Sequence, residues 1–520
     1  MNYENWLKNI LDRHSAIPVT IERDWIRVTV SPNLLPELVG ALTHDWIFAG
    51  IVPENDPGIQ AVRLLYVFYA QHGPWVGIEV SNHDQSVPTV SALLFAADWQ
   101  EREMEDLFDV HFEGHPQLGD FVLHDDHWPE GTAPMRRHSW EIHPKATEPQ
   151  DLSMPRIVEA PGSFVMPVGP VYSGTAESIQ FHLETVGEEI VFAHIRPFYK
   201  YRAVEKILEG QEPSVALLIA ERIDGLTAFA HSLALAQALE TLADTPVPPR
   251  AKLLRVFWAE FERIRSHIHV LAGILESTGL SVPANLMQAL EENLLQVSGV
   301  SAGHRYLFGL NKLGGLSRDW SHAEIQTIVH QLGTVVQQSQ RILDALAFDN
   351  SFLDRLESVG VLNRDLAISH GLVGPVARAS GVNRDLRAWQ EYAAYDQITF
   401  GIPVQSEGDG YARFRQLCQE IDQSYGIIQQ IPPLLSPETP MASGVRITET
   451  GTAFGYVESP SGAIICGVSV NGQGMIERSR VVTPGLVNWH AFPQAVRHFA
   501  FQDFPIILAT FGLSVADLDR

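Results

Sequence analysis

The chain has 520 residues, of which 45% are hydrophobic and 19% are charged. A single hydrophobic core rarely extends over so long a chain, so two or more domains are expected, and the apolar share excludes a largely disordered protein. Lysine and arginine total 36 against 62 aspartates and glutamates, which gives a formal net charge of -26 and argues against a nucleic acid partner.

Cysteine is scarce, since Cys418 and Cys466 are the two in the sequence. Two thiols cannot build a disulfide framework or a four-thiolate iron–sulfur or zinc site, so any iron–sulfur cluster is expected in a partner subunit. Both are interpreted as core thiols. No basic region followed by an apolar stretch opens the sequence, and no apolar run is long enough to span a bilayer, which together predict a cytoplasmic protein.

Residues 1–125 are predicted to form a small α+β domain. Apolar runs at 25–30 and 64–69 are typical of strands, and they alternate with helical stretches. From 126 to 160 the sequence is rich in His, Pro, Glu and Arg without a sustained period, which indicates a linker.

Residues 161–520 are predicted to form a second, mainly helical domain with peripheral β-hairpins. Two strands are expected at 178–186 and 189–195, followed by long helices. The clearest helix covers 252–277, where apolar residues recur at steps of four and three and predict one buried stripe. Residues 445–470 return to β-like sequence with glycine turns, and a short helical segment follows.

The sequence contains no self-sufficient catalytic motif. It has no glycine-rich phosphate loop, no dinucleotide fingerprint and no His-Glu-x-x-His metal helix. His267 and His269 lie two apart on a predicted helix and therefore point to different faces, which argues against a shared metal site.

The segment from Trp99 to Pro116 reads Trp-Gln-Glu-Arg-Glu-Met-Glu-Asp-Leu-Phe-Asp-Val-His-Phe-Glu-Gly-His-Pro. It resembles, nearly position for position, the signature of the 30-kDa (C-type) subunit of complex I. Asp109 stands where that family has glycine. The resemblance implies a 30-kDa-subunit-like fold for the first domain.

Residues 165–520 resemble the 49-kDa (D-type) subunit of complex I and, more closely, the large subunits of group 4 membrane-bound hydrogenases. The matching stretches are Gly169-Pro170-Val171-Tyr172, Glu221-Arg222-Ile223, His231-Ser232-Leu233-Ala234, 255–267, 374–381 and Arg480-Val481-Val482-Thr483-Pro484. The order of the two halves is that of the fused large subunits of formate hydrogenlyase type. The resemblance implies a fused C/D-type subunit of a complex I-like or hydrogenase-related complex.

The positions of the nickel–iron ligands depart from the hydrogenases. There, Glu-Arg-Ile is followed by two cysteines, whose places are taken here by Asp224 and Thr227, and the C-terminal cysteine pair falls on Ser514 and Asp517. Nickel–iron needs soft thiolates, whereas oxygen ligands favour magnesium or manganese if any metal. These four are therefore interpreted as degenerate ligand positions that converge without binding a metal, and hydrogenase activity is not expected.

In complex I the quinone cavity occupies the region of the former active site. The resemblance implies that electrons pass to quinone or another acceptor near Tyr172, Asp224, His231 and Asp517. At the family's Gly-Pro-x-His-Pro turn, Tyr172 replaces histidine and Ser173 replaces proline, so the quinone ligand does not carry over directly. Two aspartates brought together would raise one pKa and create a proton-handling site, unless each is hydrogen-bonded or hydrated.

A charged helix carries a second set of candidates. Glu260, Glu262, Arg263 and His267 match the charged positions of the family motif. Spacing alone favours solvated glutamates or salt bridges, since Glu260 stands three residues before Arg263. The resemblance implies instead buried ionisable groups that couple the redox region to the membrane arm. The candidate catalytic residues are Tyr172, His231, Glu260 and Arg263.

The favoured function is a core redox subunit, similar to those of NADH-quinone oxidoreductase, that passes electrons from a partner's iron–sulfur cluster to quinone or another acceptor and binds no cofactor itself. The expected partners are a small B-type iron–sulfur subunit, a ferredoxin-like cluster subunit and antiporter-like membrane subunits, which would hold it at the cytoplasmic face of the inner membrane. No nicotinamide motif occurs, so any NADH activity would belong to the whole complex. The alternative is a non-catalytic scaffold or conformational coupler in a hydrogenase-related ion-translocating complex.

Overall fold

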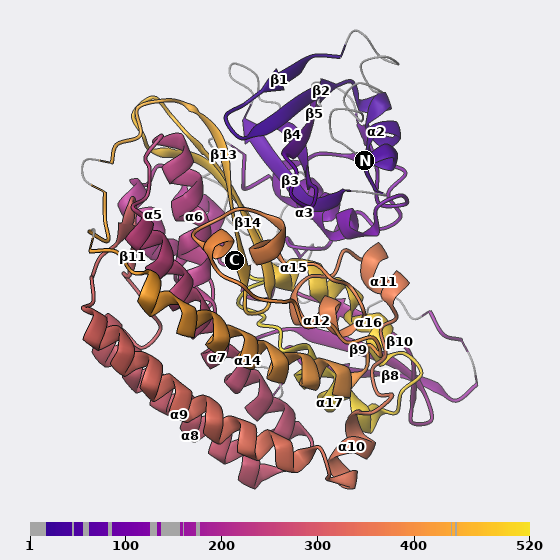
Figure 1. The fold of residues 1–520 in the computed structure, drawn as a ribbon. Helices are drawn as coiled ribbons and strands as arrows, with labels where there is room; N and C mark the ends of the chain where they lie inside the picture. Colours follow the sequence, from indigo (N-terminus) through magenta and orange to yellow (C-terminus); the bar gives the residue numbers. More distant parts are fainter. Residues whose placement is uncertain are drawn as a thin grey trace.

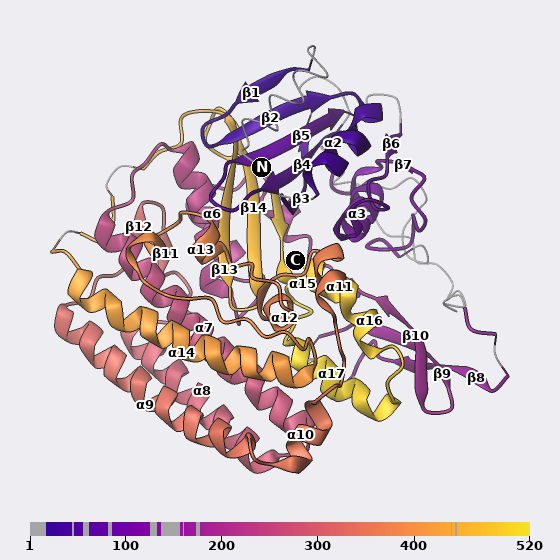
Figure 2. The same cartoon turned by 45° about the vertical axis from the view of Figure 1, so that its right-hand side comes forward.

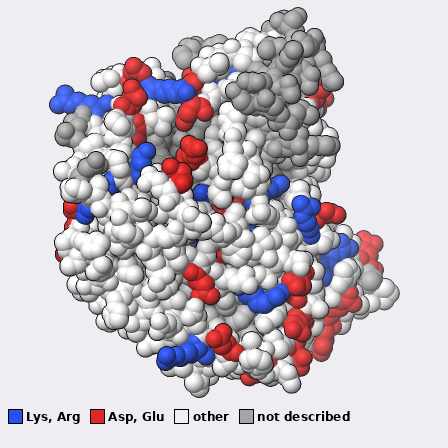
Figure 3. Space-filling model, viewed as in Figure 1, with Lys and Arg blue, Asp and Glu red and all other residues white. Residues whose placement is uncertain are grey.

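The computed structural model describes residues 17–43, 46–55, 62–81, 86–124, 133–136, 157–159, 161–172, 177–437, 439–442 and 445–520. The predicted linker at 126–160 lies outside these residues, apart from 133–136 and 157–159. Across the described ranges, no helix is both long and apolar enough to cross a bilayer. On the face drawn in Figure 3, lysines and arginines are scattered and form no continuous basic patch.

Residues 17–124 form a five-stranded sheet with helices, as the sequence predicts. The strand order is β1-β2-β5-β4-β3, with β2 and β5 parallel and the other neighbours antiparallel. Seven of the eight side chains of β4 are buried, because apolar residues fill both of its faces. The elements are β1 (Val19–Ile21), β2 (Trp25–Val30), α2 (Leu35–Leu42), β3 (Ile47–Asn55), β4 (Val62–Tyr69), β5 (Trp75–Ser81), β6 (Val87–Pro88), α3 (Asp98–Phe108) and β7 (Phe112–Glu113), with short 3-10 turns at Pro32–Leu34 and Phe95–Ala97.

Four long helices lie side by side in the second body (Figure 1): α7 (Pro249–Ser277), α8 (Ser281–Ala302), α9 (His322–Leu346) and α14 (Gly410–Leu434). Helix α7 packs against α8 and α14, and α9 closes the group by packing against the same two. A capping box starts α9, because Ser321 and Glu324 each accept a backbone N–H from the other.

Shorter helices complete this body. They are α4 (Val204–Leu208), α5 (Pro213–Ala220), α6 (Ala228–Leu242), α10 (Asn350–Leu356), α11 (Arg364–Ser369), α12 (Gly374–Ala379), α13 (Leu386–Trp389), α15 (Pro484–Asn488), α16 (Phe492–Val496) and α17 (Phe504–Phe511), with 3-10 turns at Tyr395–Gln397, Trp489–Ala491 and Phe501–Asp503.

Helix α7 confirms the helix expected at 252–277 but not its single buried stripe. Every residue from Leu253 to Ile268 is buried, including the charged ones. The helix also packs against α6 and α17, so other elements surround the stretch 253–268 on all sides. Helical spacing identified the apolar stripe, but it could not reveal that the charged face is covered as well.

The two predicted strands near residue 180 are β9 (Gln180–Val186) and β10 (Glu189–Arg196), which pair with β8 (Ser163–Val168) in an antiparallel sheet. This sheet projects from the edge of the molecule (Figure 2). A two-stranded ribbon, β11 (Asn311–Lys312) with β12 (Gly315–Leu316), lies elsewhere in the chain.

The expectation that all hairpins are peripheral is wrong for the last sheet. Strands β13 (Gly451–Ser459), β14 (Gly462–Val470) and β15 (Ile476–Val482) stand between α6 and the N-terminal domain (Figure 2). All residues of β14 except Ser469 are buried, because both faces are covered. A Cβ on Gly455 would lie 1.9 Å from the carbonyl oxygen of Ala234 in α6, so the close packing of strand on helix requires glycine there.

A buried ion-pair network joins the N-terminal domain to the second body. Glu103 of α3 contacts Arg480 of β15 at 2.7 Å and Arg520 at 2.6 Å. Glu205 of α4 contacts the same two arginines, at 3.5 and 3.1 Å, so two carboxylates balance two guanidinium groups. Nε of Arg480 also donates to the carbonyl oxygen of Ile51 in β3 at 3.1 Å. These contacts bind the domains through paired charges removed from water.

Aromatic rings make a second contact between the two bodies. Trp75 of β5 stacks on Tyr456 of β13 with ring centroids 4.8 Å apart. Trp25 of β2 meets Phe454 edge to face at 5.1 Å. The N-terminal domain therefore contacts β13 through aromatic packing and β15 through ion pairs.

Replacing Glu103 by alanine should lower the free energy of unfolding by about 3–5 kcal/mol, because Arg480 and Arg520 would remain buried without one of their partners. Burial alone would raise the pKa of Glu103, but the two arginines hold it below its usual value. The stabilisation is therefore present above the unfolded-state pKa of about 4.5 and is lost as the pH falls through the folded-state value. Denaturant unfolding as a function of pH measures both effects.

The exposed pair of Glu292 and Arg305 provides the control, because its side chains are 43% and 50% exposed. Glu292→Ala should leave the unfolding midpoint unchanged. Equal midpoints for the Glu103 and Glu292 variants would contradict the role given to the buried network.

Candidate functional site

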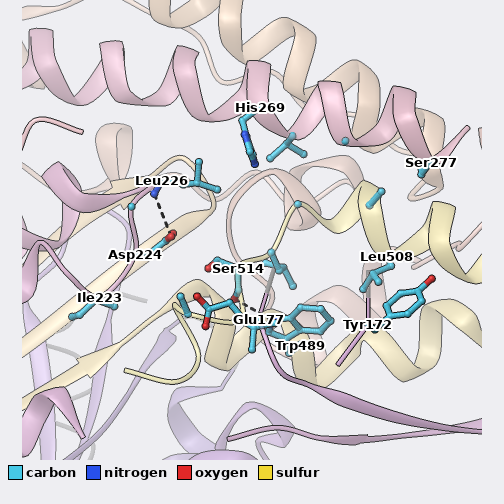
Figure 4. Close-up of a pocket in the computed structure, with 18 of the residues that line it drawn as sticks. Tyr172, Glu177, Ile223, Asp224, Leu226, His269, Ser277, Trp489, Leu508 and Ser514 are labelled. Atoms are coloured by element: carbon cyan, nitrogen blue, oxygen red, sulfur yellow. Dashed lines mark hydrogen bonds between the residues drawn. The ribbon is translucent and has the colours of Figure 1, made fainter. Parts of the chain in front are cut away.

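A cavity of about 730 Å³ opens between the second half of α7 and α17 (Figure 4). His269, Gly273 and Ser277 line it from α7, where they follow one another at about one helical turn. Leu508 lines it from α17, and Trp489 forms part of the wall. Two packed helices thus supply part of a wall that mixes apolar and polar side chains.

Of the four positions predicted to be degenerate ligands, Asp224 and Ser514 line this cavity, and Thr227 and Asp517 lie next to them. Thr227 Oγ1 donates to Asp224 Oδ2 at 3.0 Å, and the amide of Asp517 donates to Ser514 Oγ at 3.4 Å. Asp517 Oδ1 lies 3.1 Å from His231 Nε2. The loop before α6 carries the first pair and the loop after α17 carries the second, so the fold brings together residues that are far apart in sequence.

The electrostatics of the two aspartates differ. Burial raises the pKa of Asp224, and the neighbouring carboxylate of Asp517 raises it further. Asp517 has polar partners in His231, which lies at hydrogen-bond distance, and in the amide of Gly485, which donates to Oδ2 at 2.7 Å. The amide of Leu226 and the hydroxyl of Thr227 donate to Asp224, but burial still keeps its pKa above the usual value.

The site does not fit a nickel–iron centre. Its four side chains offer carboxylate and hydroxyl oxygens, which are harder ligands than thiolates. Thr227 already bonds Asp224, and Ser514 accepts the backbone amide of Asp517. Cys466 is buried in β14 and Cys418 is half-buried in α14, as expected for core thiols, and burial raises the pKa of both. Across the described residues, no group of His, Cys, Asp or Glu is arranged to hold a metal ion.

The remaining predicted candidates fall into three places. Tyr172 lines the cavity, with its ring centroid 6.4 Å from that of Phe504. His231 lies behind the cavity wall and is 2% exposed. Glu260 and Arg263 are fully buried and do not border the cavity, so the structure does not unite all four candidate catalytic residues.

Glu260 and Arg263 belong instead to a buried charge cluster between α7, α12, α13, α14 and β13. Arg263 Nε lies 3.3 Å from Glu260 Oε2, so the pairing expected from their spacing exists, but in the interior and not at the surface. The cluster comprises three arginines and four carboxylates together with one histidine: Arg263, Arg378, Arg387, Glu260, Asp385, Glu420, Glu458 and His267. One carboxylate is in excess when His267 is neutral.

Burial and the neighbouring charges of this cluster shift the pKa values of its titratable side chains. Burial would raise the pKa of Glu420, but Arg378 and His267 hold it well below its usual value. Burial and the nearby carboxylate of Asp385 raise the pKa of Glu458. Burial also lowers the pKa of His267. The pKa values of Glu420 and Glu458 are thus shifted in opposite directions within one cluster, although both carboxylates accept a hydrogen bond from Arg378.

Glu262 lies on α7 between Glu260 and Arg263 in sequence, and its carboxylate caps α6. Its two oxygens accept the amides of Phe229 and Ala230 at 2.8 and 3.0 Å. Burial raises the pKa of Glu262 to about 8, although Arg265 and the two amides act in the opposite direction. A carboxyl group near Asp224 is thus able to change its protonation near neutral pH.

Sequence reasoning missed several groups. Glu420 and Glu458 come from α14 and β13, and no spacing along the chain links them to α7. Arg202, which lies between β10 and α4, lines the cavity. Arg202 stands between a predicted strand and Glu205 in sequence, and this setting does not indicate that its side chain lines a cavity.

The pKa of Glu262 predicts a specific dependence of stability on pH. The folded-state value of about 8 lies above the unfolded-state value of 4.5, so the contribution is complete below pH 4.5 and is lost as the pH rises through about 8. Between pH 6 and pH 9 the free energy of unfolding should fall by up to about 1.4 kcal/mol per pH unit for this group. Glu262→Gln, which cannot ionise, should flatten the fall, whereas Glu292→Gln at the surface should not. An unchanged slope in the Glu262 variant would refute the assignment.

Three family models match the chain. The model for the 30 Kd subunit of respiratory-chain NADH dehydrogenase matches residues 28–141, and the model for the 49 Kd subunit matches 278–449 and 438–520. The model for nickel-dependent hydrogenase matches 202–271, the segment that holds Asp224 and Glu262.

Curated relatives match two thirds of this chain or more. The C/D 2 subunit of NADH-quinone oxidoreductase from Aquifex aeolicus (strain VF5) is 27% identical, and the match covers 90% of this chain and 89% of the relative. Formate hydrogenlyase subunit 5 of Escherichia coli (strain K12) is also 27% identical, over 96% of this chain and 89% of the relative. The D 1 subunit of NADH-quinone oxidoreductase from Chloroherpeton thalassium is 27% identical over 69% of this chain and 88% of its own length. One polypeptide therefore combines a domain that matches the 30-kDa subunit of complex I, a domain that matches the 49-kDa subunit and a hydrogenase large-subunit-like segment.

Proposed function

We propose that the chain is the core redox subunit of a membrane-associated complex and passes electrons from an iron–sulfur cluster in a partner to quinone, or to another acceptor, bound in the cavity. The observation that carries the proposal is a cavity beside Asp224 and Ser514 whose lining combines apolar side chains, such as Leu508 and Val515, with polar and charged ones. Its volume of about 730 Å³ lies within the range of roughly 300–1,000 Å³ typical of small-molecule pockets. Quinone combines a polar ring with an apolar tail and so matches this lining.

Reduction of a quinone to a quinol needs two electrons and two protons. The electrons would come from the partner's cluster. Asp224 borders the cavity, and its raised pKa suits it to give a proton to a quinone oxygen. The second proton would come from the pair formed by His231 and Asp517, directly behind Asp224. Glu262, the next buried carboxyl group, would return a proton to Asp224.

A surface beside the cavity suits the docking of the cluster-bearing subunit. Leu218 and Val215 of α5 are 47% and 41% exposed. Arg222, which lines the cavity, lies over the ring of Phe308 at 3.8 Å, and His304 stacks on that ring at 4.4 Å. Exposed apolar groups beside arginine and aromatic rings are typical of protein interfaces. We expect a small B-type subunit there, with ferredoxin-like and antiporter-like subunits beyond it, which would hold the chain at the cytoplasmic face of the inner membrane.

A second function, that of a non-catalytic scaffold or conformational coupler, is favoured by one observation. The polar groups beside the cavity bond to one another or to nearby backbone, since Thr227 donates to Asp224, the backbone amide of Asp517 donates to Ser514, and the side chain of Asp517 approaches His231. Few of these polar groups therefore remain to form hydrogen bonds with a ligand. In that case the charge cluster around Glu458 would transmit protonation changes within the complex, and the cavity would take no substrate.

Closing the cavity tests the first function against the second. Gly273 lies in the middle of α7, and an added Cβ there would meet no other atom within 4 Å. Gly273→Phe should therefore fill the cavity without disturbing the helix and weaken the binding of decylubiquinone at least about tenfold, because the ligand and the ring would compete for the same space. Calorimetric titration of the purified complex measures the change.

Gly426 of α14 provides the matched control, because a Cβ on it also meets nothing within 4 Å and it does not line the cavity. Gly426→Phe should bind decylubiquinone like the wild type. Equal affinities in the two variants would place the quinone elsewhere, and a wild-type complex that binds no quinone would favour the scaffold.

Docking of the partner predicts a second result. Leu218→Asp should reduce co-purification with a co-expressed B-type subunit, because a charge would be buried in an apolar contact. Phe348→Asp, at a side chain that is 88% exposed after α9, should have no such effect. Loss of the partner in both variants, or in neither, would argue against this surface.

The ligand chemistry predicts a third result. Elemental analysis of the purified protein should find no stoichiometric nickel, and dye reduction with hydrogen should be absent, because oxygen ligands cannot hold nickel–iron. About one nickel per chain together with hydrogen-dependent dye reduction would overturn the proposal.

A further inference from the structure

Arg202 touches both loops that border the cavity near Asp224 and Ser514. Nη1 donates to the carbonyl oxygen of Arg222 at 2.8 Å and Nη2 to that of Ile223 at 2.7 Å. Nη2 also donates to the carbonyl oxygen of Ala516, and Nε to that of Asp519 at 3.2 Å. One guanidinium group therefore binds four carbonyl oxygens, two from each loop.

The two loops are the ones that carry the degenerate ligand positions. Ile223 directly precedes Asp224, and Ala516 directly precedes Asp517. A metal ion with two ligands from each loop would hold them together, but the oxygen side chains present here do not suit the nickel–iron centre. Another cross-link is needed, because the loops come from the start of α6 and the end of α17 and share no strand or helix.

Each loop has further contacts that bind it to the rest of the protein by itself. Arg265 donates to the carbonyl oxygens of Gly225 and Leu226 at 3.1 and 2.8 Å, and these are contacts to the first loop alone. Thr483 Oγ1 donates to the carbonyl oxygen of Asp517 at 2.9 Å in the second loop alone. Arg202 differs from these residues because it spans both loops, and its backbone amide also donates to Asp519 at 3.0 Å.

We infer that Arg202 is a positioning residue that joins the two loops in place of a metal centre and so sets Asp224 against Asp517 and His231. The shape of the side chain is what makes this possible. A guanidinium group presents five N–H donors in a rigid plane and can bind several carbonyl oxygens at once, whereas an ammonium group is a compact point charge. The inference rests on the proposed function only where it concerns the ligand of the cavity.

Hydrogen–deuterium exchange of the full chain in its complex tests the inference. In Arg202→Ala, amide exchange should rise about tenfold in both peptides, 222–227 and 512–520, since both lose charge-assisted hydrogen bonds. Millimolar guanidinium should reverse the rise in both peptides by occupying the vacated space. Arg202→Lys should exchange like the alanine variant, because the charge alone cannot reach both loops.

Arg222→Ala provides the matched control. Arg222 lines the same cavity, but its side chain donates to Leu218 and Glu221 and not to the second loop. Exchange in 512–520 should therefore stay at the wild-type level in this variant. A rise confined to one peptide in Arg202→Ala, or wild-type exchange in Arg202→Lys, would overturn the inference. Failure of both Arg202 variants to fold, beside a folded Arg222 variant, would also overturn it, because the role would then be global.

Binding of decylubiquinone to the same variants separates this inference from the proposed function. A positioning role predicts weaker binding in Arg202→Ala and recovery with guanidinium, which a general loss of stability would not give. If the wild type binds no decylubiquinone, the proposed acceptor fails while the exchange result still decides the role of Arg202.

Discussion

A charge can be buried only where an opposite charge or a set of hydrogen bonds is buried with it, and this constraint governs the structure. Residues 253–268 of α7 are all buried, although this stretch carries arginines and glutamates. Its charges find partners on α13 and α14 and in the carbonyl groups of β13, elements that are distant in sequence. The same constraint joins the domains, where Glu103 and Glu205 face Arg480 and Arg520. Paired charges therefore specify which elements pack together, in addition to the apolar surface that drives the packing.

The sequence was most informative where local patterns decide the structure. Alternating and continuous apolar runs predicted the strands β2, β4, β9 and β10, and helical periodicity predicted α7. It was least informative about burial of charge, because the exposed and the buried alternatives for Glu260 have the same spacing along the helix. The place of β13–β15 could not be predicted either, since the N-terminal domain that covers this sheet is more than three hundred residues away in sequence. Such partners become visible only when the fold is known.

The candidate site shows a similar division. Motifs flanking Asp224 and Asp517 led to the expectation that they converge, and the structure places them within one electrostatic environment. Motifs could not indicate that His231 lies behind the wall or that Glu260 lies in another cluster. Nor could they identify Arg202, whose contacts are all to backbone carbonyl groups. A residue that recognises main-chain atoms leaves no signature in the side chains of its partners.

The ion pair between Glu103 and Arg520 spans 417 positions of the sequence. During synthesis on the ribosome, the carboxylate of Glu103 therefore has neither of its two arginine partners until nearly all of the second body has been made. The N-terminal sheet is able to form early from contacts close in sequence, but its docking face remains incomplete until β15 and the segment after α17 have emerged. Assembly of the two bodies is thus a late event in biogenesis, and a nascent chain stalled before residue 480 would expose a charged and aromatic face to the surveillance of molecular chaperones.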